Sequence, residues 1–305
     1  MNAFRGKKVL VTGGAGFIGS HLAQRVLKEG AEECRVLDNL ATSDGTNVPG
    51  EAVFLKWDLA EDKLDKAVKD VHYIFHLAAV PRTQYCLEHP LSCHRANAFA
   101  TLRLLDACVS SCRQLEKFVY SSSCAIYGKQ NAIPISEDAP KYHGTPYALQ
   151  KLIGEEYARM YAALHRIPAI ALRYANVYGT RRQSESGSYP NALAAFSRQK
   201  RESGEISITG DGTQTRDFVH VFDVVEANLK AAFSSVRDGS AYNIGTGRGI
   251  SMNQIAQFFN CPVRYAAPRA GESKHLVLDV AKAKSELGWS PAVSLEEGMG
   301  IYFNS

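Results

Sequence analysis

VLVTGGAGFIG, residues 9–19, is the stretch that decides the fold. Its apolar beginning predicts a buried strand over 7–12, and a helical pattern follows over 21–29. Between them, Gly13, Gly16 and Gly19 recur at every third residue. Such a loop turns tightly, lets its backbone approach a pyrophosphate and packs the helix close to the strand, because glycine has no Cβ. The stretch therefore predicts a dinucleotide-binding strand–loop–helix whose helix N-terminus faces the phosphates.

An acidic residue, Asp38, ends the next predicted strand, over 34–38. A carboxylate at this point accepts hydrogen bonds from both ribose hydroxyls and repels a 2′-phosphate. The sequence therefore predicts NAD rather than NADP as the cofactor. Asp58 follows a further predicted strand. There it could contact the adenine edge or cap a helix, and the sequence leaves both alternatives open.

Strands alternate with helical patterns through the first half of the chain, which predicts right-handed crossovers and a parallel sheet. We therefore expect an α/β fold: a Rossmann-type doubly wound parallel sheet with a smaller α/β substrate-binding lobe. The NAD-binding domain is predicted over 1–175, with a return segment near 215–235. Residues 176–305 are predicted to form mainly the substrate-binding lobe, including a short strand over 241–244.

The composition excludes several classes of protein. A net charge of +4 over 305 residues does not predict nucleic-acid binding, which needs a clustered basic face. The sequence has no apolar run long enough to predict a membrane span, and its first residues lack the apolar core of a signal peptide. The seven scattered cysteines are typical of reduced thiols and do not form a metal set. We therefore expect a cytoplasmic protein without a metal site.

Three residues form a candidate catalytic group: Ser123 at the end of a predicted strand over 117–122, and Tyr147 and Lys151 on one face of a predicted helix over 147–164. A free tyrosine has a pKa of about 10, and a lysine ammonium nearby favours its phenolate. The serine hydroxyl can hydrogen-bond to the reacting oxygen. These residues suit proton removal from an alcohol that loses a hydride. The alternative is a buried tyrosine and a lysine on an ordinary helix, and the glycine loop favours catalysis.

Together these motifs resemble the extended short-chain dehydrogenase/reductase family and, within it, the NAD-dependent nucleotide-sugar epimerases of the UDP-glucose 4-epimerase type. The resemblance rests on the loop 12–19, the strand end 38–40, the segment 76–79 and the catalytic residues, and it covers nearly the whole chain. Beyond the three glycines and Asp38, it implies cofactor contacts from Phe17, Ile18, Asn39, Asp58, Leu59, Leu77, Ala78, Ala79, Asn97, Tyr147 and Lys151.

The resemblance also implies a nucleotide-diphosphate sugar as substrate. Besides Ser123 and Tyr147, the substrate-binding residues it implies are Arg82 facing the sugar, Asn176, Arg216 and Arg269 at the phosphates, and Glu272 at the ribose. Guanidinium groups suit phosphate oxygens because they donate in pairs. The alternative for Arg216 is a surface arginine paired with Asp217. The resemblance further implies a homodimer formed through the helices over 98–111 and 147–164.

The resemblance implies inversion at C4 of a nucleotide-linked hexose, such as UDP-glucose, UDP-galactose or an N-acetyl form, through a transient 4-keto sugar. One alternative is an oxidoreductase or a dehydratase, although Cys124 and Ala125 offer no acid to eliminate water. Cys124 itself is expected to be a packed thiol. Another alternative is a non-catalytic dinucleotide-binding scaffold, since a fold does not fix a function.

Overall fold

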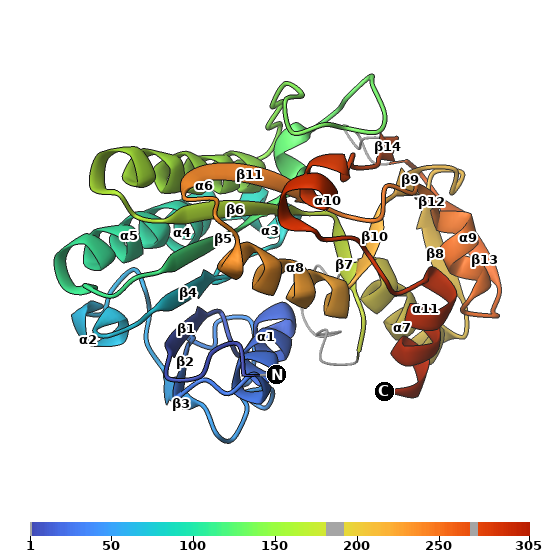
Figure 1. The fold of residues 1–305 in the computed structure, drawn as a ribbon. Helices are drawn as coiled ribbons and strands as arrows, with labels where there is room; N and C mark the ends of the chain where they lie inside the picture. The colour runs from blue at the N-terminus through green and yellow to red at the C-terminus, as the bar shows by residue number, and fades with distance from the viewer. Residues whose placement is uncertain (1, 181–191, 269–273) are drawn as a thin grey trace.

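The computed structural model describes residues 2–180, 192–268 and 274–305, and a parallel sheet of seven strands lies at its centre (Figure 1). From one edge to the other, the strands are β11 (Asp238–Ile244), β6 (Ala169–Tyr174), β5 (Lys117–Ser123), β4 (Tyr73–His76), β1 (Lys8–Thr12), β2 (Glu33–Leu37) and β3 (Val53–Leu55). The chain runs from β1 to β3 on one side and then crosses to β4 on the other side. Ligands bind at such a switch point in open α/β sheets. The predicted Rossmann-type fold is confirmed.

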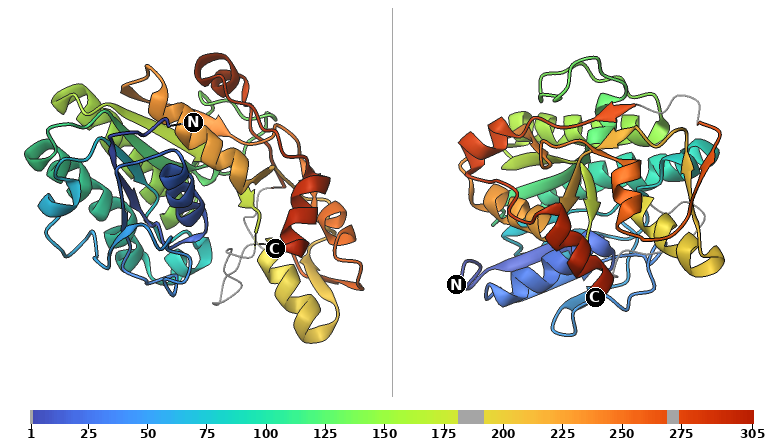
Figure 2. Two further views of the ribbon diagram at one scale, coloured as in Figure 1. Left: turned by 60° about the horizontal axis from the view of Figure 1, so that its bottom comes forward. Right: turned by 90° about the vertical axis from the view of Figure 1, so that its right-hand side faces the viewer.

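Helices cover both faces of this sheet (Figures 1 and 2). One face carries α1 (Phe17–Lys28) and α8 (Val221–Phe233), and the other carries α2 (Asp65–Val68), α5 (Ala100–Ser111) and α6 (Pro146–His165). Because both faces are covered, the strands are apolar on both sides. In β1, Val9 and Val11 pack toward the first face and Leu10 packs toward the second.

Shorter elements connect the helices and strands near the carboxyl ends of the sheet. They are α3 (Thr83–Glu88), α4 (Pro90–His94), the π-helical turn η1 (Arg95–Phe99), the 3-10 helix η2 (Cys124–Tyr127), β7 (Asn176–Tyr178) and β10 (Phe218–His220). The strands β7 and β10 pair with each other in a small parallel sheet. Within the described ranges, no helix is both long and apolar enough to cross a membrane.

A smaller α/β lobe lies beside the main sheet and has its own apolar core (Figure 2). Its helices and strands are α7 (Ala192–Ser203), β8 (Ile206–Thr209), β9 (Thr215–Arg216), β12 (Ile250–Ser251), α9 (Met252–Gln257), β13 (Val263–Ala266), β14 (His275–Leu276) and α11 (Leu295–Asn304). The strands β12, β9 and β14 form one small sheet, and β8 pairs with β13.

The chain returns to the main sheet farther along the sequence than predicted. Helix α8 packs on the sheet as expected, but the strand predicted over 241–244 for the smaller lobe is part of β11, the edge strand paired with β6. A helix, α10 (Ala281–Leu287), packs against this edge. The prediction was wrong because a short apolar run carries no information about which sheet it joins. We therefore assign 221–244 to the NAD-binding domain.

Candidate active site

The glycine loop after β1 has no room for side chains. Gly13 has φ +68°, and a Cβ there would lie 2.7 Å from the backbone nitrogen of Ala78. A Cβ at Gly19 would overlap the carbonyl oxygen of Gly13. Helix α1 begins after Gly16 without a side-chain cap, so the first-turn amides, including those of Phe17 and Ile18, face outward from the helix end. The loop therefore has the close packing and free amides that a pyrophosphate requires.

Asp38 connects the end of β2 to this loop. Its Oδ2 accepts a hydrogen bond from the Ala15 amide at 3.1 Å, and its Oδ1 accepts one from the Leu40 amide at 2.9 Å. Burial raises the pKa of Asp38, and these two hydrogen bonds oppose the rise. Each oxygen keeps an acceptor site for a ribose hydroxyl. The loop and Asp38 together therefore fit an NAD molecule.

Asn39 and Asp58 lie together at the ends of β2 and β3. Asn39 Nδ2 donates to Asp58 Oδ2 at 2.8 Å, while Asp58 Oδ1 accepts from the Ala60 amide at 2.7 Å. Asp58 thus stabilises the turn that follows it, in the way that a capping residue stabilises the start of a helix, but helix α2 begins only at Asp65. Its contact with the adenine edge remains a prediction. Leu59 is buried in the core beneath the second face of the sheet. Any contact that Leu59 makes with a cofactor would therefore come from its backbone.

The segment that follows β4 is held by a buried polar chain. Thr12 Oγ1 lies 2.7 Å from His76 Nδ1 and accepts a hydrogen bond from the Ala78 amide at 3.2 Å. His76 Nε2 lies 2.9 Å from Thr101 Oγ1 on α5. Burial, with a smaller effect of nearby Lys151, lowers the pKa of His76 to about 3, so the ring is neutral. This chain fixes 77–79, the predicted cofactor contacts Leu77, Ala78 and Ala79, beside the glycine loop.

Asn97 has both ends of its side chain bound to protein groups. Its Oδ1 accepts from the Val80 amide at 2.7 Å, and its Nδ2 donates to Gln150 Oε1 at 2.8 Å. Asn97 therefore ties the segment after β4 to α6. Its predicted contact with the cofactor remains a prediction.

The three candidate catalytic residues meet at the carboxyl end of β5. Helix α6 begins as predicted, with Pro146 in its first turn and the Thr145 side chain capping the Ala148 amide. Tyr147 is buried and lies near the Ser123 side chain. Lys151, one turn farther along α6, is also buried and donates from Nζ to the Ser121 carbonyl at 2.7 Å.

The charge balance of this group differs from the expectation. Burial raises the pKa of Tyr147, and the nearby Ser123 hydroxyl opposes the rise. Burial lowers the pKa of Lys151 to about 7. Lys151 is therefore only partly protonated at neutral pH, and within the protein alone it does not bring Tyr147 to the phenolate. The sequence-based argument left out the cost of burying the ammonium, which opposes its attraction for a phenolate.

Cys124 is the first residue of η2, directly after Ser123, and is buried in the core of the main sheet. Burial raises the pKa of its thiol to about 12, with smaller opposing effects of Asp217 and Arg216. The thiol therefore stays protonated, which confirms the expected packed cysteine. These electrostatic effects also indicate that Arg216 and Asp217 lie close to the end of β5.

The predicted phosphate-binding residues of the smaller lobe surround Asp217. Asn176 begins β7, and both its amide and its Nδ2 donate to the Asp217 carbonyl, at 2.9 and 3.3 Å. Arg216 is partly buried in β9 and donates to the Thr215 carbonyl at 2.9 Å. Asn176 and Arg216 are therefore brought together. Arg82 is partly buried at the start of α3. Two further predictions, Arg269 and Glu272, lie outside the described residues.

Asp217 itself is fully buried, which contradicts the alternative of a surface pair with Arg216. Its Oδ1 accepts from the amide and hydroxyl of Thr246, both at 2.7 Å. Its Oδ2 accepts from the amides of Gly247 at 3.0 Å and Leu278 at 3.3 Å. One carboxylate therefore holds three segments of the chain around Arg216.

Comparisons with known proteins agree with this geometry. The sequence profile of the NAD dependent epimerase/dehydratase family matches residues 9–245. The chain belongs to this family. The UDP-glucose 4-epimerase of Mycolicibacterium smegmatis is 33% identical, and the alignment covers 96% of each chain. The predicted family and its dependence on NAD are thereby confirmed.

Two solved structures resemble this family member over nearly its whole length. The UDP-glucose 4-epimerase of Thermotoga maritima with UDP-glucose has a TM-score of 0.91 and 34% identity, covering 97% of this chain and 98% of that chain. The UDP-glucose 4-epimerase of Thermus thermophilus in complex with NAD has a TM-score of 0.88 and 33% identity, with the same coverage.

The sequence missed the residues that hold this epimerase-family site in place. Gln150, Glu155, Arg173 and Asp217 are buried polar residues, and each hydrogen-bonds to a segment distant in sequence. Two signals were available: Gln150 and Glu155 lie on the same helix as Lys151, and Arg173 directly follows the apolar run 167–172. Neither signal identifies the distant partner.

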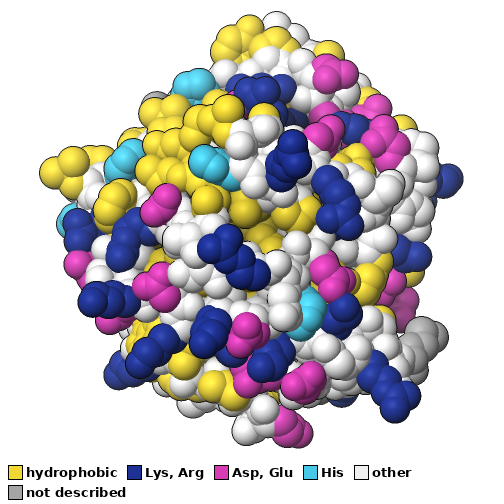
Figure 3. Space-filling model, turned by 60° about the vertical axis from the view of Figure 1, so that its left-hand side comes forward, with side chains coloured by type: hydrophobic (Ala, Val, Ile, Leu, Met, Phe, Trp, Pro, Cys, Tyr) yellow, Lys and Arg dark blue, Asp and Glu magenta, His cyan; other side chains and the backbone are white. Residues whose placement is uncertain are grey.

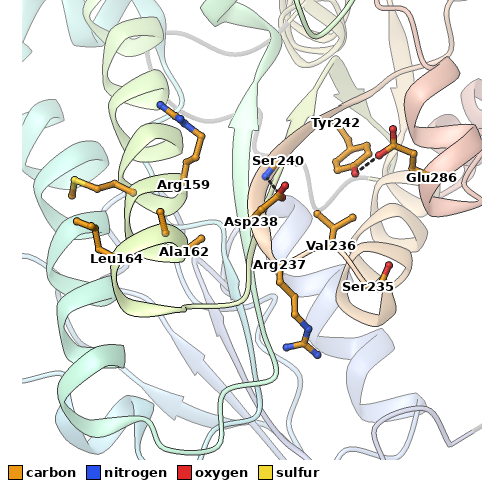
Figure 4. Close-up of a pocket in the computed structure, with 12 residues that line it drawn as sticks. Arg159, Ala162, Leu164, Ser235, Val236, Arg237, Asp238, Ser240, Tyr242 and Glu286 are labelled. Atoms are coloured by element: carbon orange, nitrogen blue, oxygen red, sulfur yellow. Dashed lines mark hydrogen bonds between the residues drawn. The ribbon is translucent and has the colours of Figure 1, made fainter.

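A separate open groove lies at the other end of α6. Figure 4 shows Arg159, Asp238 and Tyr242 along it, with the Tyr242 hydroxyl donating to Glu286. None of its lining residues is a predicted site residue. The groove therefore lies apart from the candidate catalytic residues at the carboxyl end of β5.

Proposed function

We propose that this chain is an NAD-dependent epimerase that inverts C4 of a nucleotide-linked hexose through a transient 4-keto sugar. The observation that carries the proposal is the meeting of three side chains at the carboxyl end of β5. Ser123 ends the strand, Tyr147 is buried at the start of α6, and Lys151 Nζ donates to the Ser121 carbonyl at 2.7 Å. This group lies at the edge of the sheet where the glycine loop also opens. A proton-transfer group beside a dinucleotide site suits oxidation of an alcohol and the reverse reduction.

In the proposed reaction, the Tyr147 oxygen takes the proton of the sugar 4-hydroxyl and returns it after inversion. Ser123 hydrogen-bonds to the reacting oxygen. Lys151 has a pKa of about 7, so its amine can hold or release a proton near neutral pH. NAD, when bound, supplies the acceptor and later the donor of the hydride, and its oxidised nicotinamide ring adds a positive charge that favours the phenolate.

Inversion requires that the 4-keto sugar turn over within the site. In our proposal Asn176, Arg216 and Arg269 hold the diphosphate, Glu272 contacts the ribose, and Arg82 faces the sugar. Charge-assisted hydrogen bonds to the phosphates contribute about 1.5–3 kcal/mol each and hold the nucleotide. Because the substrate is held at its phosphates, the sugar is left free to rotate. The glycine loop, Asp38 and the segment 77–79 hold the cofactor.

The experiment that tests this proposal is incubation with a panel of nucleotide sugars that varies the base and includes N-acetyl forms. Mass and stereochemistry of the products are read together with NADH absorbance. We expect the 4-epimer with no net NADH. Stoichiometric NADH would select an oxidoreductase, loss of water a dehydratase, and no turnover a dinucleotide-binding scaffold.

The matched variant is Tyr147→Phe, which keeps the ring and removes the proton acceptor. We expect its kcat to fall by roughly 10³-fold, as for loss of a general base. Full epimerase activity in Tyr147→Phe would contradict the proposed role of Tyr147.

We also propose a homodimer formed through α5 and α6. Exposed apolar side chains gather on this side of the molecule (Figure 3), and helix α6 exposes Leu149, Met160 and Leu164. Light scattering should give twice the chain mass, and replacing Leu149 and Leu164 with Glu should give the monomer. A monomeric wild-type protein would contradict the dimer.

A reducing compartment such as the cytoplasm is the final part of this proposal. All seven cysteines are free thiols, and six of them are buried. Buried thiols that form no disulfides suit a compartment that keeps them reduced.

A further inference from the structure

A buried ion pair between α6 and β6 takes no part in the proposed chemistry. Arg173 Nε donates to Glu155 Oε2 at 3.1 Å, and its Nη2 donates to Glu155 Oε1. Both side chains are only 5% exposed. Burial acts against the charged guanidinium, but the adjacent Glu155 carboxylate holds the pKa of Arg173 above its usual range. Two parallel hydrogen bonds fix the orientation of the two groups as well as their distance.

The same pair reaches both sides of Ser123. Ser122, the residue before it, donates from Oγ to Glu155 Oε2 at 2.8 Å. Tyr127, which ends the 3-10 helix after Ser123, accepts from Arg173 Nη1 at 2.8 Å through its hydroxyl oxygen. The catalytic serine therefore lies between two residues that the ion pair holds.

On α6 the ion pair is in line with the catalytic residues. Tyr147, Lys151 and Glu155 follow at intervals of four residues, are all buried and share one face of the helix. A rotation or a slide of α6 that separated Tyr147 from Ser123 would also break the contacts of Glu155. The position of the helix and the position of the serine are thus set by one carboxylate.

We infer that the Glu155–Arg173 ion pair is a positioning group that sets the distance between Ser123 and Tyr147. This inference rests on the function proposed above. Two well-packed apolar side chains often stabilise a core at least as well as a buried ion pair. The geometry that the pair enforces on β5 and α6 therefore explains its presence better than stability does.

The experiment compares two double variants on the same helix. Glu155→Met with Arg173→Met removes the buried pair without leaving a single charge. The control, Glu156→Met with Arg159→Met, removes an exposed pair whose two members both lie on α6. Steady-state kinetics, NAD affinity and thermal unfolding are measured for wild type and both variants.

We expect kcat of the Glu155/Arg173 variant to fall by roughly 10²-fold, since a displacement of about 1 Å costs that much, while KM changes by less than about threefold. The control should keep wild-type kcat. Wild-type kcat in the Glu155/Arg173 variant, or a rise in KM alone, would overturn the inference. If that variant does not fold, Glu155→Asp takes its place, because it keeps the charge and shortens the reach. Unchanged kcat in Glu155→Asp would equally overturn it.

Failure of the proposed function gives a different result. If the wild-type protein epimerises no nucleotide sugar, the proposed function is contradicted. The positioning role of the ion pair is then tested by structure instead of by kinetics. Crystal structures of wild type and the Glu155/Arg173 variant then decide. We expect Tyr147 to move away from Ser123, and an unchanged distance would overturn the inference.

Discussion

The glycine loop and the Arg216 segment are both predicted to bind phosphates, yet they are built in different ways. The loop is shaped by sterics among neighbours: Gly13, Gly19 and the backbone at Ala78 approach so closely that no Cβ fits. The Arg216 segment is shaped by one buried carboxylate, Asp217, which accepts hydrogen bonds from residues far along the chain. A site made by close packing is visible in the sequence as glycine, whereas a site held by a distant hydrogen-bond acceptor is not.

The largest effect on ligand binding is expected where a side chain is added to the closely packed glycine loop. Gly13→Ala places a Cβ 2.7 Å from the Ala78 amide and adds strain at φ +68°. Overpacking of this kind costs about 1–3 kcal/mol, so we expect NAD affinity to fall by up to roughly 10²-fold in calorimetry.

Gly204→Ala is the matched control for this prediction. Gly204 has φ +74°, but a Cβ added there would meet no atom within 4 Å, so only the backbone strain is added. We expect NAD affinity to stay as in wild type and stability to fall by about 1 kcal/mol. Equal NAD affinity in Gly13→Ala and Gly204→Ala would mean that close packing does not shape the loop.

The Arg216 segment should respond to the loss of a charge rather than to added volume. Asp217→Asn keeps the shape but turns a donor toward backbone amides that need an acceptor. We expect unfolding in urea to show a loss of about 3 kcal/mol. KM for the nucleotide sugar should rise on the order of tenfold while NAD affinity stays unchanged. If Asp217→Asn weakened the binding of NAD as much as that of the nucleotide sugar, the glycine loop and the Arg216 segment would not be independent of each other.

The most specific effect concerns Lys151, whose Nζ donates to the Ser121 carbonyl on β5. Burial lowers its pKa from 10.5 to about 7, so between these values the unfolded chain binds one more proton than the folded chain. The contribution of Lys151 to the free energy of unfolding therefore rises with pH across that window, by at most about 1.4 kcal/mol per pH unit. The destabilisation caused by burying Lys151 reaches its full size below pH 7. Lys151→Met removes this dependence.

Urea unfolding of wild type and Lys151→Met at pH 6 to 9, without NAD, measures the difference directly. We expect the variant to be relatively most stable at pH 6 and to lose this advantage as pH rises. Parallel pH curves would contradict a buried Lys151 with a lowered pKa.

The sequence alone was enough to predict the Rossmann-type sheet, the family and NAD as cofactor, and it proposed Ser123, Tyr147 and Lys151 as candidate catalytic residues. This was possible because each signal depends on residues that are close together in the sequence. They are glycines at the spacing that one turn requires, an acid at the end of the next strand, and two side chains one helical turn apart. The apolar runs of a parallel sheet are equally local.

The tertiary structure alone decided how these residues are held and charged. In the structure, 241–244 belong to the main sheet, Asp217 is fully buried, and Glu155 forms an ion pair with Arg173. The tertiary structure also lowered the pKa of Lys151 to about 7, where the sequence had suggested a full ammonium. Burial and long-range hydrogen bonds depend on which segments meet in space, and no spacing within the chain records those meetings.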